Sequence, residues 1–431
     1  MLFFVILLIL IIALIFISTV FFKKTFNPIS IINFVFSLWL ILGRLGLYGQ
    51  CIPTPESSVF IELNILLLDL FIIVGCFIKV SKNKEKIHKI RFNSELFFKV
   101  FRIICLILSL IIFVNMLIGI ITGHYSITSI REMSYSTRYG DDAYTKIYFN
   151  GFIYVFYQYI VRGFAFFDLT YRFGKLLCRG EKIPIATILN FIFFILIMQS
   201  RIEILKVVIF VIIFFLFSSI KLNKKQKKIL IRSALVLIIA ALATFSVRSI
   251  SGNNGVLSNS ANSLIVDYSG SNYMFSTYYD DHNNGLTLKD SPLVLKYLGG
   301  LGLIIERTLA PFGLMFDHSV VNEYLTTGHD IGSSDHYNAF YTVYFEFMNS
   351  GGYFGCFLFS IILGTIIGFS YKKRAKSPSL KTIYVATFLT YVAVMGTYNY
   401  VLSGIYAFTI VCCILLSNDD TRSIPEGELH G

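Results

Sequence analysis

Apolar segments long enough to cross a lipid bilayer recur from one end of the 431-residue chain to the other. A hydrocarbon core of roughly 30 Å requires about 20 consecutive, mostly apolar residues in a helix. Only 14% of the residues are charged, against roughly 25% in soluble domains. A helix bonds its backbone polar groups within one segment, as the bilayer interior requires. The sequence therefore predicts an all-α, polytopic membrane protein.

The apolar runs predict about eleven membrane helices. They cover residues 2–22, 28–47, 59–79, 96–121, 148–170, 184–200, 202–220, 229–247, 352–370, 382–398 and 400–416. No basic stretch precedes the first run and no small-residue cleavage site follows it. We therefore expect a retained helix there, and not a signal peptide.

Basic residues gather in every second loop between these helices. The clusters are Lys23-Lys24 and residues 79–91, 172–182, 221–228 and 372–376. Because Lys and Arg favour the cytoplasmic side of a membrane, the alternation predicts an outer N-terminus and a cytoplasmic C-terminus. The same distribution accounts for the net charge of +12, so we expect a lipid bilayer and no nucleic acid as partner.

One long outer segment, residues 248–351, divides the chain. Membrane helices are predicted in residues 1–247 before it and in residues 352–431 after it. The first part of the segment is rich in Gly, Asn and Ser and is expected to be irregular. Residues 293–316 are more apolar, and we expect a surface or re-entrant helix pair there.

Five arginines fall on or near the predicted outer face, where the positive-inside bias disfavours them. They are Arg131, Arg138, Arg201, Arg248 and Arg307. A guanidinium group is a planar fork of donors that suits phosphate oxygens. We expect Arg201, Arg248 and Arg307 to bind a diphosphate. Arg201 also opens a helix, where a phosphate would meet the helix N-terminus, although an ion pair with Glu203 or a lipid headgroup contact is an alternative.

The end of the outer segment is a second candidate site. A helix that begins near His336 would bring polar side chains to one face, and a break is expected at Gly351-Gly352. These side chains are Asp335, Asn338, Thr342 and Glu346, with His336 beside them. An imidazole or a carboxylate could take a proton from a sugar hydroxyl. The alternative is an amphipathic surface helix whose tyrosines form an aromatic belt.

Other site classes lack support in the sequence. The outer histidines have no metal-ligand spacing, and no phosphate-binding loop of a nucleotide site occurs, so we expect no metal and no cofactor. The predicted spans are read as nearly free of charge, with Asp69 as the lone carboxylate. Asp69 is either a packing residue or a proton relay. Spans without charge and one long outer loop argue against a transporter.

With these residues in view, the chain resembles the bacterial oligosaccharide repeat-unit polymerases, also called O-antigen polymerases, and the related O-antigen ligases. Three features carry the resemblance: the Ser200-Arg201 turn between two helices, the single dominant outer loop, and the exit of that loop. The exit holds His336, Asn338, Glu346, Gly352 and Gly355. An Arg followed ten residues later by Gly, a pattern of some of these polymerases, does not occur at the outer-loop arginines.

The resemblance implies a metal-independent membrane glycosyltransferase in the bacterial cytoplasmic (inner) membrane. It would join lipid-linked repeat units, carried on undecaprenyl diphosphate, into O antigen of lipopolysaccharide or into capsule. His336, Glu346 or Asp335 would be the base, and Asn338 and Tyr337 would bind sugar. A chain-length regulator is a further expected partner. A ligase and a non-enzymatic flippase for lipid-linked oligosaccharides stay open as alternatives.

Overall fold

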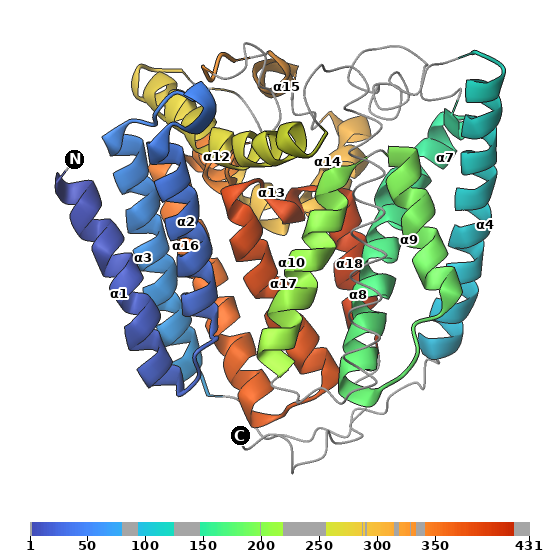
Figure 1. Cartoon of the computed structure of the whole chain (residues 1–431), viewed down its shortest axis with the longest axis horizontal. Coiled ribbons are helices and arrows are strands. Elements are labelled where there is room, and N and C mark those ends of the chain that lie inside the picture. The colour runs from blue at the N-terminus through green and yellow to red at the C-terminus, as the bar shows by residue number, and fades with distance from the viewer. Residues whose placement is uncertain are drawn as a thin grey trace. The chain divides into compact units, whose positions relative to one another are not determined.

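The computed structural model describes residues 2–79, 94–124, 147–198, 200–218, 256–286, 288, 291–313, 319–327, 329–332 and 341–417. These residues form helices, turns and connecting segments, and none of them belongs to a β-strand. The all-α prediction is therefore confirmed (Figure 1).

Six helical segments of the described chain are long and apolar enough to cross a membrane. They are α1 (Leu2–Phe22), α2 (Pro28–Leu45), α3 (Pro55–Phe77), α4 (Ser94–Ile121), α16 (Val343–Lys376) and Leu380–Thr397, which begins as α17 (Leu380–Val394). Each of the six falls within or around a predicted span. The larger number of about eleven spans stays a prediction.

The chain forms two compact units. Unit 1 consists of Met1–Ser81, Ser260–Ser377 and Val385–Gly404. Unit 2 consists of Lys82–Asn259, Pro378–Tyr384 and Ile405–Gly431. The predicted boundaries at residues 247 and 351 separate membrane helices from the long outer segment, and they stay predictions.

The central helix pair of unit 1 is α3 with α16, which lie side by side (Figure 1). Gly364 and Gly368 of α16 form a small-xxx-small motif, which lets two membrane helices approach closely. A methyl group at Gly364 would overlap the carbonyl oxygen of Leu68, and one at Gly368 would overlap that of Ile72. The absence of side chains at these two positions therefore sets the spacing of the pair.

Part of the outer segment forms a long helix, α12 (Val256–Asn283), which crosses the end of α2 in Figure 1. The predicted irregular chain is therefore wrong from Val256 onward. Tertiary contacts outweigh the weak helix propensity of this sequence. The indole Nε1 of Trp39 donates to the carbonyl oxygen of Tyr268 at 2.9 Å and to Ser271 Oγ at 3.0 Å.

The helix α16 contains the break that the sequence predicts. Gly352 has φ 58° and ψ −152°, a backbone conformation that non-glycine residues rarely adopt. The helix begins at Val343, because Thr342 is an extended N-cap residue with φ −61° and ψ 167°. The predicted continuous helix from near His336 is therefore wrong at Thr342. The ring of Tyr341 packs on Phe345 with a centroid distance of 4.6 Å, which anchors the chain just before the helix.

Short helices follow α12. Two helices are present where the sequence predicts a pair, α13 (Leu293–Leu298) and α14 (Gly300–Leu309), followed by η4 (Ala310–Phe312) and α15 (Ser319–Thr326). The surface or re-entrant placement of the pair stays a prediction. Gly299 joins α13 to α14 with φ 56°. A side chain at Gly299 would overlap the carbonyl oxygen of Leu402, so the turn requires glycine.

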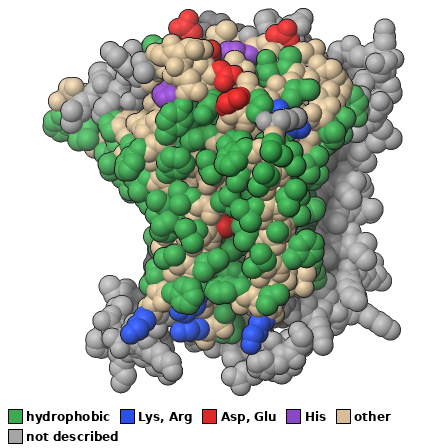
Figure 2. Space-filling model, turned by 90° about the vertical axis from the view of Figure 1, so that its left-hand side faces the viewer, with side chains coloured by type: hydrophobic (Ala, Val, Ile, Leu, Met, Phe, Trp, Pro, Cys, Tyr) green, Lys and Arg blue, Asp and Glu red, His purple; other side chains and the backbone are tan. Residues whose placement is uncertain are grey.

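The face of unit 1 in Figure 2 carries an apolar belt between two polar ends. Lys and Arg gather at one end, where α1, α3 and α16 finish. Lys372 Nζ donates to the carbonyl oxygen of Ile78 at 3.2 Å. Burial and, to a smaller extent, the charge of Arg374 lower the pKa of Lys24. Asp, Glu and His side chains lie at the opposite end. This separation is typical of a membrane-spanning unit.

Unit 2 contains α4, α7 (Gly151–Phe156), η3 (Tyr157–Val161), α8 (Arg162–Arg179), α9 (Ile185–Met198), α10 (Arg201–Ser218), the first residues of α17 and α18 (Ile405–Leu416). The η3 turn is a π-helix inserted between α7 and α8. Such single π-turns occur frequently at functional sites. Here the π-turn ends at the residue before Arg162.

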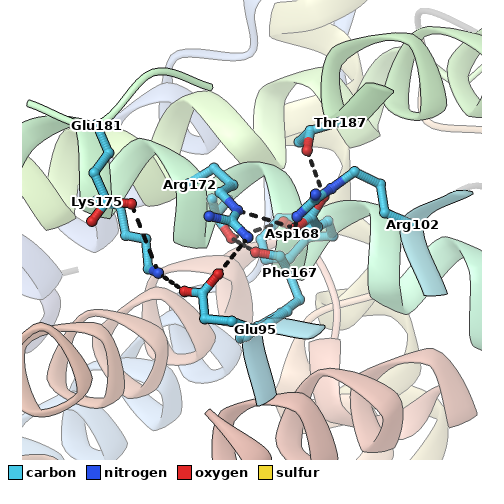
Figure 3. A network of polar contacts seen from close by, with 10 residues as sticks. Glu95, Arg102, Phe167, Asp168, Arg172, Lys175, Glu181 and Thr187 are labelled. Carbon is cyan, nitrogen blue, oxygen red and sulfur yellow. Dashed lines mark hydrogen bonds and ion pairs between the residues drawn. The ribbon is translucent and has the colours of Figure 1, made fainter. Parts of the chain in front are cut away.

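An ionic network joins three helices of unit 2, with Arg102 and Asp168 in its buried part (Figure 3). Arg102 of α4 binds both oxygens of Asp168 of α8, with Nε–Oδ2 at 2.6 Å and Nη2–Oδ1 at 2.7 Å. Thr187 of α9 donates to Asp168 Oδ2 at 2.6 Å. Arg172 and Lys175 of α8 pair with Glu95 of α4. The network cross-links α4, α8 and α9.

The same network corrects one predicted helix end. The sequence predicts that this helix stops at residue 170 and that Arg172, Lys175 and Arg179 lie in a cytoplasmic loop. Instead, α8 continues to Arg179. Because Arg172 and Lys175 pair with Glu95 of α4, they have a counter-charge while they remain within the helix.

Candidate functional site

Five of the eight predicted site residues lie outside the described residues. They are Arg248, Asp335, His336, Tyr337 and Asn338. Arg131, Arg138 and His318, which the sequence analysis also considered, lie outside them too. The predicted roles of these residues stay predictions. The remaining three, Arg201, Arg307 and Glu346, belong to described helices.

Glu346 lies in the first turn of α16 and is already paired. Its Oε2 is 2.8 Å from Lys296 Nζ of α13, and the two side chains are 23% and 16% exposed. The ion pair ties α13 to α16 beside the Gly352 break. A general base must be able to reach a substrate proton. The ammonium partner favours a structural role for Glu346 over that of a base.

The two described arginines fall in different units. Arg307 is exposed in the last turn of α14 in unit 1, where a cation complements the helix dipole. Arg201 is the first residue of α10 in unit 2, as the sequence predicts, and its side chain lies outside the described set. The two residues therefore do not form one described site.

A buried cluster of charges lies in the first two turns of α10. Glu203 Oε1 accepts from Arg162 Nη2 of α8 at 2.6 Å and from Lys206 Nζ at 2.9 Å. The side chains of Glu203 and Lys206 are each 3% exposed, and that of Arg162 is 20% exposed. Two cations thus share one carboxylate. We call Arg162, Glu203, Lys206 and Tyr406 the cationic cluster.

Helix α18 completes the cationic cluster with an aromatic ring. The Arg162 guanidinium lies over the ring of Tyr406 at 4.2 Å, and Lys206 Nζ lies 5.3 Å from the same ring centroid. Gly163 permits this approach, because a methyl group there would overlap the carbonyl oxygen of Tyr406. Cation–π contacts stabilise a positive charge without neutralising it.

Two helix ends add further positive potential. Helix α10 begins two residues before Glu203, and α18 begins one residue before Tyr406. A helix N-terminus carries about half a positive charge and exposes backbone donors. With formal charges of +2 and −1, the cationic cluster keeps a net charge of +1 among apolar helices. Two cations that share one carboxylate beside an aromatic ring and two helix N-termini form an arrangement that suits an anionic ligand.

The sequence analysis missed Arg162 and Lys206. The available signal was a basic residue inside each of two predicted spans, 148–170 and 202–220. The prediction that the spans are nearly free of charge, with Asp69 as their lone carboxylate, is wrong. Buried charged side chains in predicted spans also include Glu62, Arg102, Asp168, Glu203 and Lys206. The charges of the spans therefore do not speak against a transporter.

Unit 1 has a second candidate region at its acidic end. Phe345 of α16 packs against Tyr278 at 4.5 Å and stacks with Tyr324 at 6.2 Å. The Tyr324 hydroxyl donates to Asp281 Oδ2 at 3.0 Å. We call Tyr278, Asp280, Asp281, Tyr324, Tyr341 and Phe345 the acidic–aromatic cluster. Aromatic faces and carboxylates are groups that bind the CH faces and hydroxyls of sugars.

Within the acidic–aromatic cluster, the pKa of Asp280 lies above its ordinary value. Burial, the charge of Glu56 and the charge of Asp281 raise the pKa of Asp280. The rings of His329 and Tyr341, which flank the predicted catalytic segment, meet edge to face with centroids 6.4 Å apart. In the described part of the chain, no three His, Cys, Asp or Glu side chains are grouped to hold a metal ion.

Comparison of the chain with protein-family models, with curated proteins and with solved structures finds no match in any of the three.

Proposed function

We propose that the protein is a membrane glycosyltransferase that polymerises polyprenyl-diphosphate-linked oligosaccharide repeat units. The observation that carries the proposal is the cationic cluster, in which Arg162 and Lys206 share the carboxylate of Glu203 near the N-terminus of α10. A polyprenyl diphosphate combines an apolar tail with a doubly charged headgroup. It therefore matches a site that has cationic groups at its centre and apolar side chains around them.

At the anomeric carbon, the reaction forms one bond and breaks one, and the proton of the acceptor hydroxyl passes to a base. A hydroxyl oxygen of the acceptor repeat unit attacks the anomeric carbon of the donor sugar. The bond from that carbon to the diphosphate oxygen breaks, and the polyprenyl diphosphate leaves with the electron pair. Fixed cations stabilise the charge that develops on this leaving group. Arg162 and Lys206 are suited to this role, with Arg201 at the N-terminus of α10.

A base must take the proton of the attacking hydroxyl. His336 and Asp335 keep this predicted role, while the ion pair with Lys296 makes Glu346 the weaker candidate. Considered by itself, the acidic–aromatic cluster of unit 1 offers stacking surfaces and hydrogen-bond acceptors that suit sugars. Asn338 and Tyr337 keep their predicted sugar-binding role. No step in this scheme requires a metal or a cofactor.

The proposed topology has about eleven spans, with the N-terminus outside and the C-terminus in the cytoplasm of a bacterium. The basic end of unit 1 would face the cytoplasm, and its acidic end the outer side. The product would be O antigen or capsule, made on the outer face of the cytoplasmic membrane. A chain-length regulator is a proposed partner.

A flippase for lipid-linked oligosaccharides is the second candidate, because charges are buried within several predicted spans. A ligase would use the same groups as the polymerase. The glycan profile of a deletion strain separates the three. We expect single repeat units on their lipid carrier that a membrane-impermeant reagent can label from outside. Repeat units protected from the reagent would indicate a flippase, and long polymer retained on the carrier would indicate a ligase.

A further inference from the structure

Helices α2 and α3 of unit 1 are both long and apolar enough to cross a membrane, and both carry buried polar side chains. We call this set of buried polar side chains the seam. Asn33 and Ser37 lie on α2, and Glu62 and Asp69 lie on α3, with Arg44 at the outer end of α2. Six side-chain atoms along the seam have no hydrogen-bond partner among the described residues: Asn33 Oδ1, Ser37 Oγ, Arg44 Nε, Glu62 Oε1, Glu62 Oε2 and Asp69 Oδ1. Each buried, unsatisfied polar atom costs about 1–3 kcal/mol. Such a concentration of buried, unsatisfied polar atoms requires an explanation.

The two carboxyl groups face the same way. Glu62 and Asp69 are seven residues apart on α3, which is about two turns and about 10 Å along the axis. The residue exposures are 0% for Glu62 and 2% for Asp69. Arg44 Nη2 donates to Ser58 Oγ at 3.3 Å, one turn before Glu62. The seam therefore runs from the outer end of α3 to the depth of Asp69.

Few charged groups face these carboxyls. Arg44 is the cation near Glu62, and neither carboxyl oxygen of Glu62 has a hydrogen-bond partner among the described residues. Asp69 Oδ2 accepts from Asn33 Nδ2 at 2.8 Å, and the phenol of Tyr344 on α16 is the titratable group near it. Helix α1, which also packs on α3, carries no ionisable side chain. A buried carboxylate with so little compensation takes up a proton instead.

We propose that Glu62 and Asp69 form a proton-binding relay inside unit 1. Each carboxyl binds one proton, which forms one O–H bond and removes one negative charge from the apolar interior. Asn33 orients Asp69 by donating to Oδ2, which leaves Oδ1 for the proton. The relay does not depend on the proposed glycosyl transfer.

Dicyclohexylcarbodiimide tests the relay on the wild-type protein in lipid nanodiscs. This apolar reagent modifies protonated carboxyls in apolar surroundings, and mass spectrometry of the digested protein locates the adduct. We expect adducts on Glu62 and Asp69 at neutral pH, with less labelling as the pH rises. Absence of adducts on both residues would overturn the proposal. Protection by sodium ions at constant pH would assign the site to sodium and also overturn it.

Infrared difference spectra provide a second measurement. The carbonyl stretch of a protonated carboxyl should be present in the wild type at neutral pH and should weaken in Glu62→Gln and in Asp69→Asn. The matched control is Glu56→Gln, which changes a carboxylate at the outer end of the same helix and should leave the band unchanged. A band of wild-type intensity in both folded single variants would refute the relay.

Discussion

Replacing Lys206 by Met tests the anion-binding role of the cationic cluster. Lys206 Nζ is 2.9 Å from Glu203 Oε1, and its side chain is 3% exposed. Methionine has a similar length and no charge. Glu203 keeps Arg162 as its partner at 2.6 Å, so the net charge of the cluster falls from +1 to 0 without leaving a lone buried carboxylate. The fold should therefore tolerate this change well.

Ligand binding should respond much more than folding. A hydrogen bond to a charged group contributes about 1.5–3 kcal/mol. Because about 1.4 kcal/mol corresponds to a tenfold change in affinity, we expect Kd for a polyprenyl diphosphate to rise roughly 10- to 100-fold. By contrast, Glu203→Gln leaves two cations without their carboxylate and should cost about 3–5 kcal/mol of stability. It should lower Tm strongly.

The assay is equilibrium binding of a synthetic polyprenyl diphosphate to detergent-purified protein, with the uncharged polyprenol as a second ligand. Lys206→Met should weaken binding of the diphosphate and leave binding of the polyprenol unchanged. The matched control is Lys175→Met, which removes a buried lysine of the same unit from the network with Glu95. Equal diphosphate affinities in wild type and Lys206→Met, with both proteins folded, would refute the reasoning.

Four further predictions concern packing, the ionic network, pH and activity. Gly368→Ala should lower Tm, measured by thermal unfolding, because its methyl group would overlap the carbonyl oxygen of Ile72. Asp168→Asn leaves its buried arginine partner uncompensated, and calorimetry should show a loss of about 3–5 kcal/mol. The folded state raises the pKa of Asp280. Its contribution to stability is therefore present at acidic pH and is lost as the pH rises through the raised pKa. Asp280→Asn should raise Tm at neutral pH and flatten the pH dependence of Tm. Arg201→Ala should abolish long-chain polysaccharide while lipid-linked single units accumulate, and unchanged chain length on gels would contradict its phosphate role.

Much of the helical architecture follows from the sequence alone. The apolar runs predict the positions of α1, α3 and α4 to within a few residues, because a membrane helix must be apolar along its length. The doublet Gly351-Gly352 predicts the break in α16, since only glycine adopts its backbone conformation readily. The start of α10 at Arg201 also agrees with the sequence. These features are local, so local patterns are enough to predict them.

The partners of the buried charges depend on the tertiary structure. Nothing in the pattern around Glu203 indicates that Arg162, 41 residues earlier, would share its carboxylate with Lys206. Likewise, α8 continues to Arg179 because Glu95 of α4 supplies a counter-charge, and α12 is helical where its composition predicts loop. Hydropathy reports the average polarity of a segment, whereas the ionic state and role of a buried group depend on the atoms that surround it. Those atoms come from helices distant in the chain, so only the folded arrangement determines them.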